Sequence, residues 1–147
     1  MIHECDSCSP GRFMPDSNSN ASECLPCNPG EYQDKEGQTS CVMCVPGFFN
    51  DMTNASVECK ACPRGWVQDK RNQTKCDVCE AGSYQIMEGQ TNCKICQVGR
   101  FSDSLGSSVE CTQCPKGWVQ DMRMQKRCNA CSPGYYQTSD CLLYTSP

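Results

Sequence analysis

Large hydrophobic side chains are scarce in this sequence. Leu, Ile, Val and Phe together account for 19 of the 147 residues, too few for an ordinary buried interior. No apolar stretch approaches the ~20 residues that a membrane-spanning helix needs, so we expect no membrane span in this fragment. The scarcity by itself would be typical of a disordered chain.

Charge and histidine are also sparse. The net charge is -4 with acids and bases interspersed, so no basic stripe predicts a nucleic-acid partner. His3 is the single histidine, and neither a Ser-His-Asp set, a phosphate-binding glycine loop nor a His-Glu-x-x-His motif can be assembled. We therefore expect no enzyme activity, no catalytic residues, no cofactor and no metal ligands.

Cysteine, by contrast, is abundant, with 17 residues. A chain so rich in cysteine is typical of scaffolds in which cross-links replace hydrophobic burial. Most of the cysteines recur in Cys-x-x-Cys pairs every 17 to 19 residues, which indicates one small repeated unit. We predict a small disulfide-rich fold, mostly irregular with short β-hairpins, arranged as an elongated tandem-repeat rod. The first members of the pairs are Cys5, Cys24, Cys41, Cys59, Cys76, Cys93, Cys111 and Cys128.

The repeats are of three kinds, which recur in order from Cys41 onward with an offset of 52 residues. One reads Gly-x-Phe and ends in Glu-Cys, the second reads Gly-Trp-Val-Gln-Asp, and the third reads Gly-x-Tyr-Gln. We infer a duplicated triplet. The expected divisions are an N-terminal remnant at 1–4, two repeats at 5–40, a first triplet at 41–92 and a second, truncated triplet at 93–140.

Each repeat has the local sequence of a minimal hairpin. Proline or a small residue followed by glycine, directly beyond the second cysteine in a Cys-x-x-Gly stretch, indicates a tight turn with positive φ. A short alternating strand and a second turn rich in Asn, Asp, Gly, Ser and Thr follow. Aromatic residues are expected at one equivalent position, either packed over a disulfide or forming a ligand-binding row. They are Phe13, Phe48, Phe101, Trp66, Trp118, Tyr32, Tyr84 and Tyr136.

The last seven residues, CLLYTSP at 141–147, break the repeat. They look like a reading frame of a sequencing-library transposase adapter, and we leave them out of the fold reasoning as a scar. The alternative is a natural divergent tail. Without Cys141, sixteen cysteines remain, which is an even number.

The form Cys-x-x-Cys-x-x-Gly-x-Tyr/Phe resembles the ephrin-receptor-like cysteine-rich repeat, of the growth-factor-receptor and tumour-necrosis-factor-receptor style of extracellular module. The resemblance covers residues 5 to about 138. It implies an extracellular or cell-surface location. The Gly-Trp-Val-Gln-Asp repeats depart from the usual Gly-x-Tyr.

Paired cysteines suit two chemistries, disulfides and zinc. Two pairs about 15 to 20 residues apart are typical of a zinc tetrathiolate site. The intervals here are mostly 13 or 14 residues, and Lys and Arg are not concentrated around the pairs. Three N-glycosylation sequons, at Asn20, Asn54 and Asn72, also favour the secretory route. We therefore expect disulfides.

The family resemblance implies a ladder in which the second cysteine of each pair bonds to the first of the next. A loop of about 15 residues then stabilises its repeat by roughly 3 kcal/mol in the chain-entropy model. From the residues alone, an interlocking one-to-three, two-to-four pattern stays open. The implied bonds join Cys8 with Cys24, Cys27 with Cys41, Cys44 with Cys59, Cys62 with Cys76, Cys79 with Cys93, Cys96 with Cys111 and Cys114 with Cys128.

The function expected from these features is that of a non-catalytic segment of a larger cell-surface or secreted protein. It would act as a spacer, a stalk or a protein-binding module, with an unknown protein ligand or neighbouring domains of the same chain as partners. The alternative is an intracellular zinc-binding array of Cys-x-x-Cys pairs that mediates protein interaction.

Overall fold

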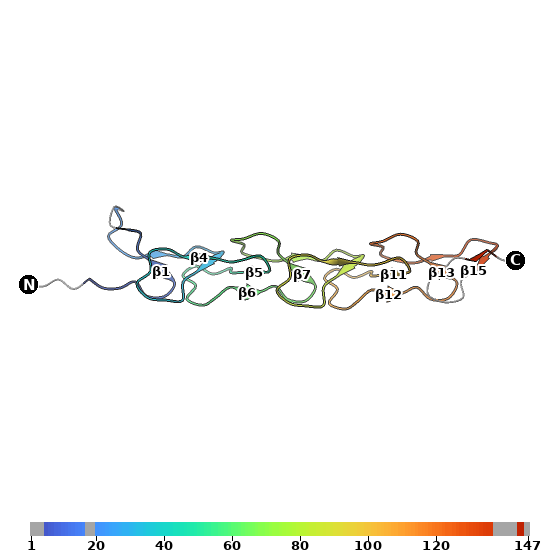
Figure 1. Cartoon of the computed structure of the whole chain (residues 1–147), viewed down its shortest axis with the longest axis horizontal. Coiled ribbons are helices and arrows are strands. Elements are labelled where there is room, and N and C mark those ends of the chain that lie inside the picture. The colour runs from blue at the N-terminus through green and yellow to red at the C-terminus, as the bar shows by residue number, and fades with distance from the viewer. Residues whose placement is uncertain (1–4, 17–19, 137–143, 146–147) are drawn as a thin grey trace, which may run out of the picture. The chain divides into compact units, whose positions relative to one another are not determined.

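The described residues form short β-hairpins joined by long loops and contain no helix (Figure 1). The computed structural model describes residues 5–16, 20–136 and 144–145. The N-terminal remnant at 1–4 lies outside them, as does most of the tail at 141–147, including Cys141. The small, disulfide-rich, mostly irregular fold expected from the sequence is therefore confirmed.

All the strands are two residues long and pair antiparallel with a neighbour in the sequence. The pairs are β1 (Arg12–Phe13) with β2 (Leu25–Pro26), β3 (Glu31–Tyr32) with β4 (Val42–Met43), β5 (Phe48–Phe49) with β6 (Lys60–Ala61), β7 (Trp66–Val67) with β8 (Asp77–Val78), β9 (Ser83–Tyr84) with β10 (Lys94–Ile95), β11 (Arg100–Phe101) with β12 (Thr112–Gln113), β13 (Trp118–Val119) with β14 (Asn129–Ala130), and β15 (Tyr135–Tyr136) with β16 (Tyr144–Thr145).

The contacts divide the chain into two units. Unit 1 comprises Met1–Cys62 and Gln68–Cys76, with β1 to β6. Unit 2 comprises Pro63–Val67 and Asp77–Pro147, with β7 to β16. The division into 5–40, 41–92 and 93–140 follows the kinds of repeat and stays a prediction.

A tight turn starts every hairpin, as the Gly30 turn illustrates. The N–H of Glu31 donates to the Asn28 carbonyl at 3.0 Å, which closes a four-residue turn with Gly30 at its third position. Gly30 has a φ of 92°, a conformation that residues with a Cβ rarely adopt. The Gly30 carbonyl then accepts from the N–H of Cys44 at 2.8 Å. The turn thereby fixes where the second cysteine of the next pair lies.

Backbone hydrogen bonds connect each repeat to the next; we name a repeat by the disulfide that closes it. In unit 1, the N–H of Gly30, in the Cys27–Cys41 repeat, donates to the Asn50 carbonyl at 2.7 Å. The N–H of Asn72, in the Cys62–Cys76 repeat, donates to the Cys44 carbonyl at 2.9 Å. The same relations recur in unit 2, where Gly82 donates to Ser102 and Met124 to Cys96. Successive repeats are thus joined through their main chains.

Cystine sulfur and side-chain amides take the place of an aliphatic core. Cys27, Cys62, Cys79 and Cys96 are fully buried, whereas most large aliphatic side chains are exposed. The buried polar residues are dominated by amides three positions after the turn glycine: Gln33, Asn50, Gln68, Gln85 and Gln120. Among the described residues, every buried side-chain nitrogen or oxygen has a hydrogen-bond partner. The repeats therefore satisfy polar groups at positions where a larger protein would place Leu or Ile.

The strand register corrects one sequence expectation. Phe48, Trp66 and Trp118 are the first residues of their strands, whereas Phe13, Tyr32 and Phe101 are second. The expectation of a shared position was wrong for those three, because the aromatic ring was used as the landmark instead of the turn glycine. Counted from glycine, Phe48 matches Arg12 and Arg100, and Phe49 matches Phe13 and Phe101.

Candidate functional site

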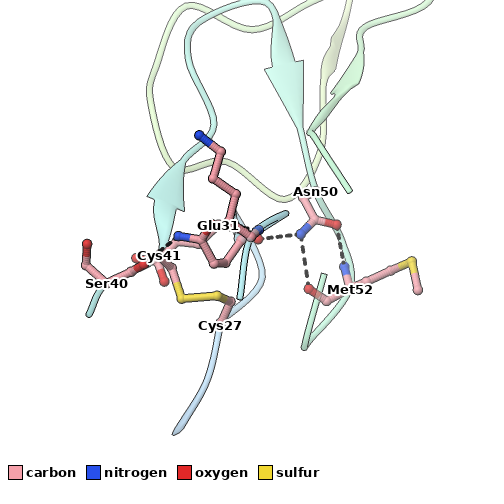
Figure 2. The surroundings of a disulfide bond; sticks show 8 residues. Cys27, Glu31, Ser40, Cys41, Asn50 and Met52 are labelled. Atoms are coloured by element: carbon pink, nitrogen blue, oxygen red, sulfur yellow. Dashed lines mark hydrogen bonds between the residues drawn. A yellow bond between two sulfur atoms is a disulfide. The ribbon is translucent and has the colours of Figure 1, made fainter. Parts of the chain in front are cut away.

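Among the described residues, seven disulfides each close one repeat. Their Cα atoms lie 5.6 to 5.8 Å apart, within the usual range for a disulfide, and their sequence separations are 14 to 16. Figure 2 shows the Cys27–Cys41 bond with the strand and loop that it joins. The bonded pairs are Cys8–Cys24, Cys27–Cys41, Cys44–Cys59, Cys62–Cys76, Cys79–Cys93, Cys96–Cys111 and Cys114–Cys128.

Two described cysteines lie outside this ladder. Cys5 is exposed and Cys131 is half-buried, and both are free. Each is the member of its Cys-x-x-Cys pair that faces away from the bonded repeats.

In the described part of the chain, a buried glutamine holds two Tyr-type and two Trp-type loops in place. In the Cys79–Cys93 repeat, Nε2 of Gln85 donates to the Asn92 carbonyl at 2.8 Å, and its Oε1 accepts from the N–H of Met87 at 3.1 Å. The side chain thus bonds to both ends of the loop. Gln33, Gln68 and Gln120 make the corresponding pairs of bonds.

Asn50 has a related role but reaches into the preceding repeat. Its Nδ2 donates to the Glu31 carbonyl at 2.6 Å, and its Oδ1 accepts from the N–H of Met52 at 3.1 Å (Figure 2). The sequence analysis noted the Gly-x-Tyr-Gln and Gly-Trp-Val-Gln patterns but gave these amides no role. The signal that could have found them is the recurrence of an amide or serine three residues after every turn glycine except Gly11, which Met14 follows.

Two of the three sequons lie at the apex of a loop. Asn54 and Asn72 are exposed and have φ values of 59° and 58°, a left-handed conformation that asparagine tolerates better than most residues. Gly106 and Met124 have the matching conformation 52 residues later, with φ values of 66° and 57°. Asn20 is exposed as well and precedes Cys24 in the first bonded repeat. The side chains of all three sequon asparagines are therefore at the surface.

The described residues offer no group of three or more His, Cys, Asp or Glu side chains that could hold a metal ion. Fourteen cysteines are bonded in the seven disulfides. A disulfide sulfur lacks the thiolate charge that binds zinc. A search of the described part of the chain also finds no helix with the length and apolarity of a membrane span.

A shallow apolar groove of about 180 Å³ lies in unit 1, over the hairpins β3–β4 and β5–β6. Glu58 lines it beside the Cys44–Cys59 bond. Burial, together with the carboxylates of Glu58 and Asp34, raises the pKa of Tyr32 above its usual value. The groove is therefore lined mainly by apolar side chains, with Glu58 as its charged residue. Its other side chains are Tyr32, Val42, Met43, Val45 and Phe48.

Unit 2 contains the counterpart of this groove 52 residues later. Tyr84, Ile95 and Glu110 match Tyr32, Met43 and Glu58, while Gln97 and Arg100 replace Val45 and Phe48. The second groove is smaller, about 120 Å³. The same fold thus provides an apolar groove in unit 1 and a polar one in unit 2.

The hairpins, the disulfides and the buried amides define a small, cystine-stabilised tandem-repeat protein. A family model described as "Tyrosine-protein kinase ephrin type A/B receptor-like" matches residues 16–57 and 70–110, more than half of the chain. The chain belongs to this ephrin-receptor-like family, whose members are non-catalytic, cysteine-rich receptor modules. No curated protein matches it. The family and the disulfide-rich fold together indicate an extracellular module.

Proposed function

We propose that this chain is a spacer or stalk in the extracellular part of a larger cell-surface or secreted protein. The observation that carries the proposal is the consecutive bonding of repeats, each closed by its own disulfide. A segment of this kind needs no hydrophobic core to remain folded. It could therefore be lengthened by adding repeats and still separate the domains on either side.

The connections between repeats support the spacer role. The turn glycine of one repeat donates to the next, as Gly47 does to the Gln68 carbonyl at 2.7 Å, and the loop of the later repeat donates back, as Asn72 does to Cys44. A flexible Gly/Ser linker lacks such bonds and behaves as a random coil. The partners of this spacer would then be neighbouring domains of the same chain.

N-glycosylation at Asn20, Asn54 and Asn72 fits the same proposal. All three side chains are exposed, and Ser56 and Thr74, the hydroxyl residues of the second and third sequons, are exposed too. Glycosylation would restrict the protein to the secretory route.

Protein binding is a second candidate function, favoured by the apolar groove of unit 1. Val42 and Val45 line it and are exposed. A spacer has no need of exposed valine at that place, whereas a docking site for another protein does. The two roles are compatible in one chain.

A thiol count with a metal assay tests the proposed class against the zinc alternative. Residues 1–140, secreted from eukaryotic cells and denatured without reductant, should show about two free thiols, Cys5 and Cys131, and no stoichiometric zinc. Sixteen free thiols with bound zinc would overturn the proposal.

Solution scattering then tests the spacer role. A radius of gyration clearly above roughly 20 Å supports it, and a value near ~14 Å, as for a compact domain of this length, contradicts it.

A further inference from the structure

Arginine occupies a recurrent place beside the disulfide in two of the three Phe-type repeats. Arg12 in unit 1 donates from Nη1 to the Cys24 carbonyl at 3.2 Å. Arg100 in unit 2 donates from Nη1 to the Cys111 carbonyl at 3.1 Å. Both arginines are the first residue of their strand and cross to the first cysteine of the following pair.

A glutamate precedes the accepting cysteine in each of these repeats. Glu23 stands before Cys24, and Glu110 stands before Cys111. Glu110 and Arg100 line the same unit 2 groove, together with the Cys111 end of the disulfide. The guanidinium of each repeat is therefore bonded to the cysteine carbonyl. In unit 2 the Glu110 carboxylate lines the same groove, without a salt bridge to Arg100 among the described residues.

The third Phe-type repeat retains the acceptors and lacks the guanidinium. Phe48 stands where Arg12 and Arg100 stand. The strand β5, which faces Cys59 across the hairpin, therefore offers no cation to the Cys59 carbonyl. Glu58 is retained, and no salt bridge to it is found in the part of the chain that the structure describes. Lys60, the next cation along the chain, lies instead 3.8 Å from Oδ1 of Asp51.

The side chains around this incomplete place are suited to a guanidinium. Phe48 and Tyr32 present aromatic rings to the groove, and planar guanidinium groups stack on aromatic faces. Burial raises the pKa of Tyr32, and the carboxylates of Glu58 and Asp34 raise it further, so both acids are near enough to Tyr32 to interact with it. Val42, Met43 and Val45 extend the groove with apolar surface and are exposed.

We propose that the unit 1 groove binds a segment of another protein that presents an arginine next to an aliphatic or aromatic side chain. The incoming guanidinium takes the place that Arg12 and Arg100 fill in their own repeats, at the Cys59 carbonyl, and Glu58 on the same groove supplies a carboxylate to it. The adjacent apolar side chain packs on Val42, Met43 and Val45. This inference rests on the second candidate function, protein binding, and identifies the chemistry of the partner.

Charge complementarity favours this occupant over a purely apolar one. A guanidinium forms charge-assisted bonds with a carboxylate and a carbonyl at once, which an aliphatic segment cannot do. An acidic segment would be repelled by Glu58 and Asp34. Arg12 and Arg100 of a second copy are bonded within their own repeats and are not free to enter the groove.

The test uses a random seven-residue peptide library displayed on phage, selected on the secreted, disulfide-bonded chain after its thiol count has been checked. Enriched peptides should contain arginine next to an aliphatic or aromatic residue. Their affinity should fall roughly tenfold or more in Phe48→Arg, which supplies the guanidinium from the chain itself, and in Glu58→Gln. Glu110→Gln, the matched carboxylate in unit 2, should leave binding unchanged.

Three results would overturn the inference for a correctly oxidised chain: no enriched peptide, enrichment without arginine, or peptides that bind Phe48→Arg as tightly as the unaltered chain. Arginine at position 48 is compatible with the fold, because two other repeats carry it. Glu58→Gln provides a second variant that changes only a surface charge. A chain with sixteen free thiols would overturn the proposed function as well, so the two failures are distinguishable.

Discussion

Gly30 lies against Asn72, a residue two repeats further along the chain. A Cβ placed on Gly30 would be 2.7 Å from the Asn72 carbonyl oxygen and 2.5 Å from its Oδ1. Gly11 and Asn54 show the same relation, with the carbonyl oxygen at 2.3 Å from such a Cβ. Each loop apex therefore covers the turn of the repeat two places earlier, so the repeats interact beyond their immediate neighbours.

This contact predicts that Gly30→Ala destabilises unit 1 more than positive φ alone explains. Gly117→Ala is the matched control, because Gly117 has a φ of 81° and no atom within 4 Å of the added Cβ. We expect Gly117→Ala to cost about 1–2 kcal/mol from backbone conformation. Gly30→Ala should cost clearly more, because the Asn72 backbone must move. Hydrogen exchange of the amides around residues 30 and 72 in Gly30→Ala, and around residue 117 in Gly117→Ala, measures the loss of stability in each variant. Equal losses would contradict the contact.

The glutamine that spans each loop should be worth more than a surface amide of the same loop. Gln85 is 2% exposed and bonds to both ends of its loop, whereas Gln90 makes an exposed bond to the Glu88 carbonyl. Gln85→Ala should cost roughly 1–3 kcal/mol, because the Met87 N–H and the Asn92 carbonyl lose their partner. The Met87 amide should exchange faster in this variant. Gln90→Ala should leave that rate unchanged, and similar effects of the two variants would show that Gln85 does not brace the loop.

Tyr32 should titrate at higher pH than a free tyrosine, because burial and the carboxylates of Glu58 and Asp34 raise its pKa. A raised pKa in the folded state means that Tyr32 stabilises the fold while its phenol is neutral. That contribution is complete below the unfolded pKa near 10 and is lost as the pH rises through the higher folded value. Subtracting the alkaline absorbance titration of Tyr32→Phe isolates this residue. Glu58→Gln should lower its pKa, and no change would contradict the place given to Glu58.

The sequons can be tested without disturbing the left-handed apex. Ser56→Ala removes the acceptor sequence of Asn54, and Thr74→Ala removes that of Asn72, while both asparagines keep their backbone conformation. Each change should remove one glycan from the chain secreted by eukaryotic cells. Ser108→Ala, at the position matching Ser56 in the Gly106 loop, should leave the glycan mass unchanged. Identical masses for all variants before and after glycosidase treatment would show that these sequons are unused.

Much of the fold could be predicted from the spacing of the cysteines. The interval between pairs predicted hairpin repeats, and the turn glycines identified where each hairpin begins, as Gly30 and Gly82 show. The role of Gln85 was not predictable from periodicity, because its bonds are to backbone atoms of its own loop. The contact of Gly30 with Asn72 joins residues that no pattern in either repeat connects.

The candidate groove could not be predicted while the repeats were aligned on their aromatic residues. Aligned on the aromatic ring, Phe48 was grouped with Phe13 and Phe101. Aligned on the turn glycine, it replaces Arg12 and Arg100. Only the second alignment shows a missing guanidinium beside Glu58. The replacement of arginine by Phe48 is present in the sequence, but it was recognised only from the strand register.

Peptide mapping without reduction tests the disulfide ladder most directly. Cleavage after Lys60 separates Cys59 from Cys62, and cleavage after Met43 separates Cys41 from Cys44. The account predicts that the fragment 44–60 then carries the Cys44–Cys59 bond as an internal cross-link and is released from its neighbours. A fragment that stays joined to Cys41 or Cys62, as an interlocking one-to-three, two-to-four pattern counted from Cys5 requires, would contradict it.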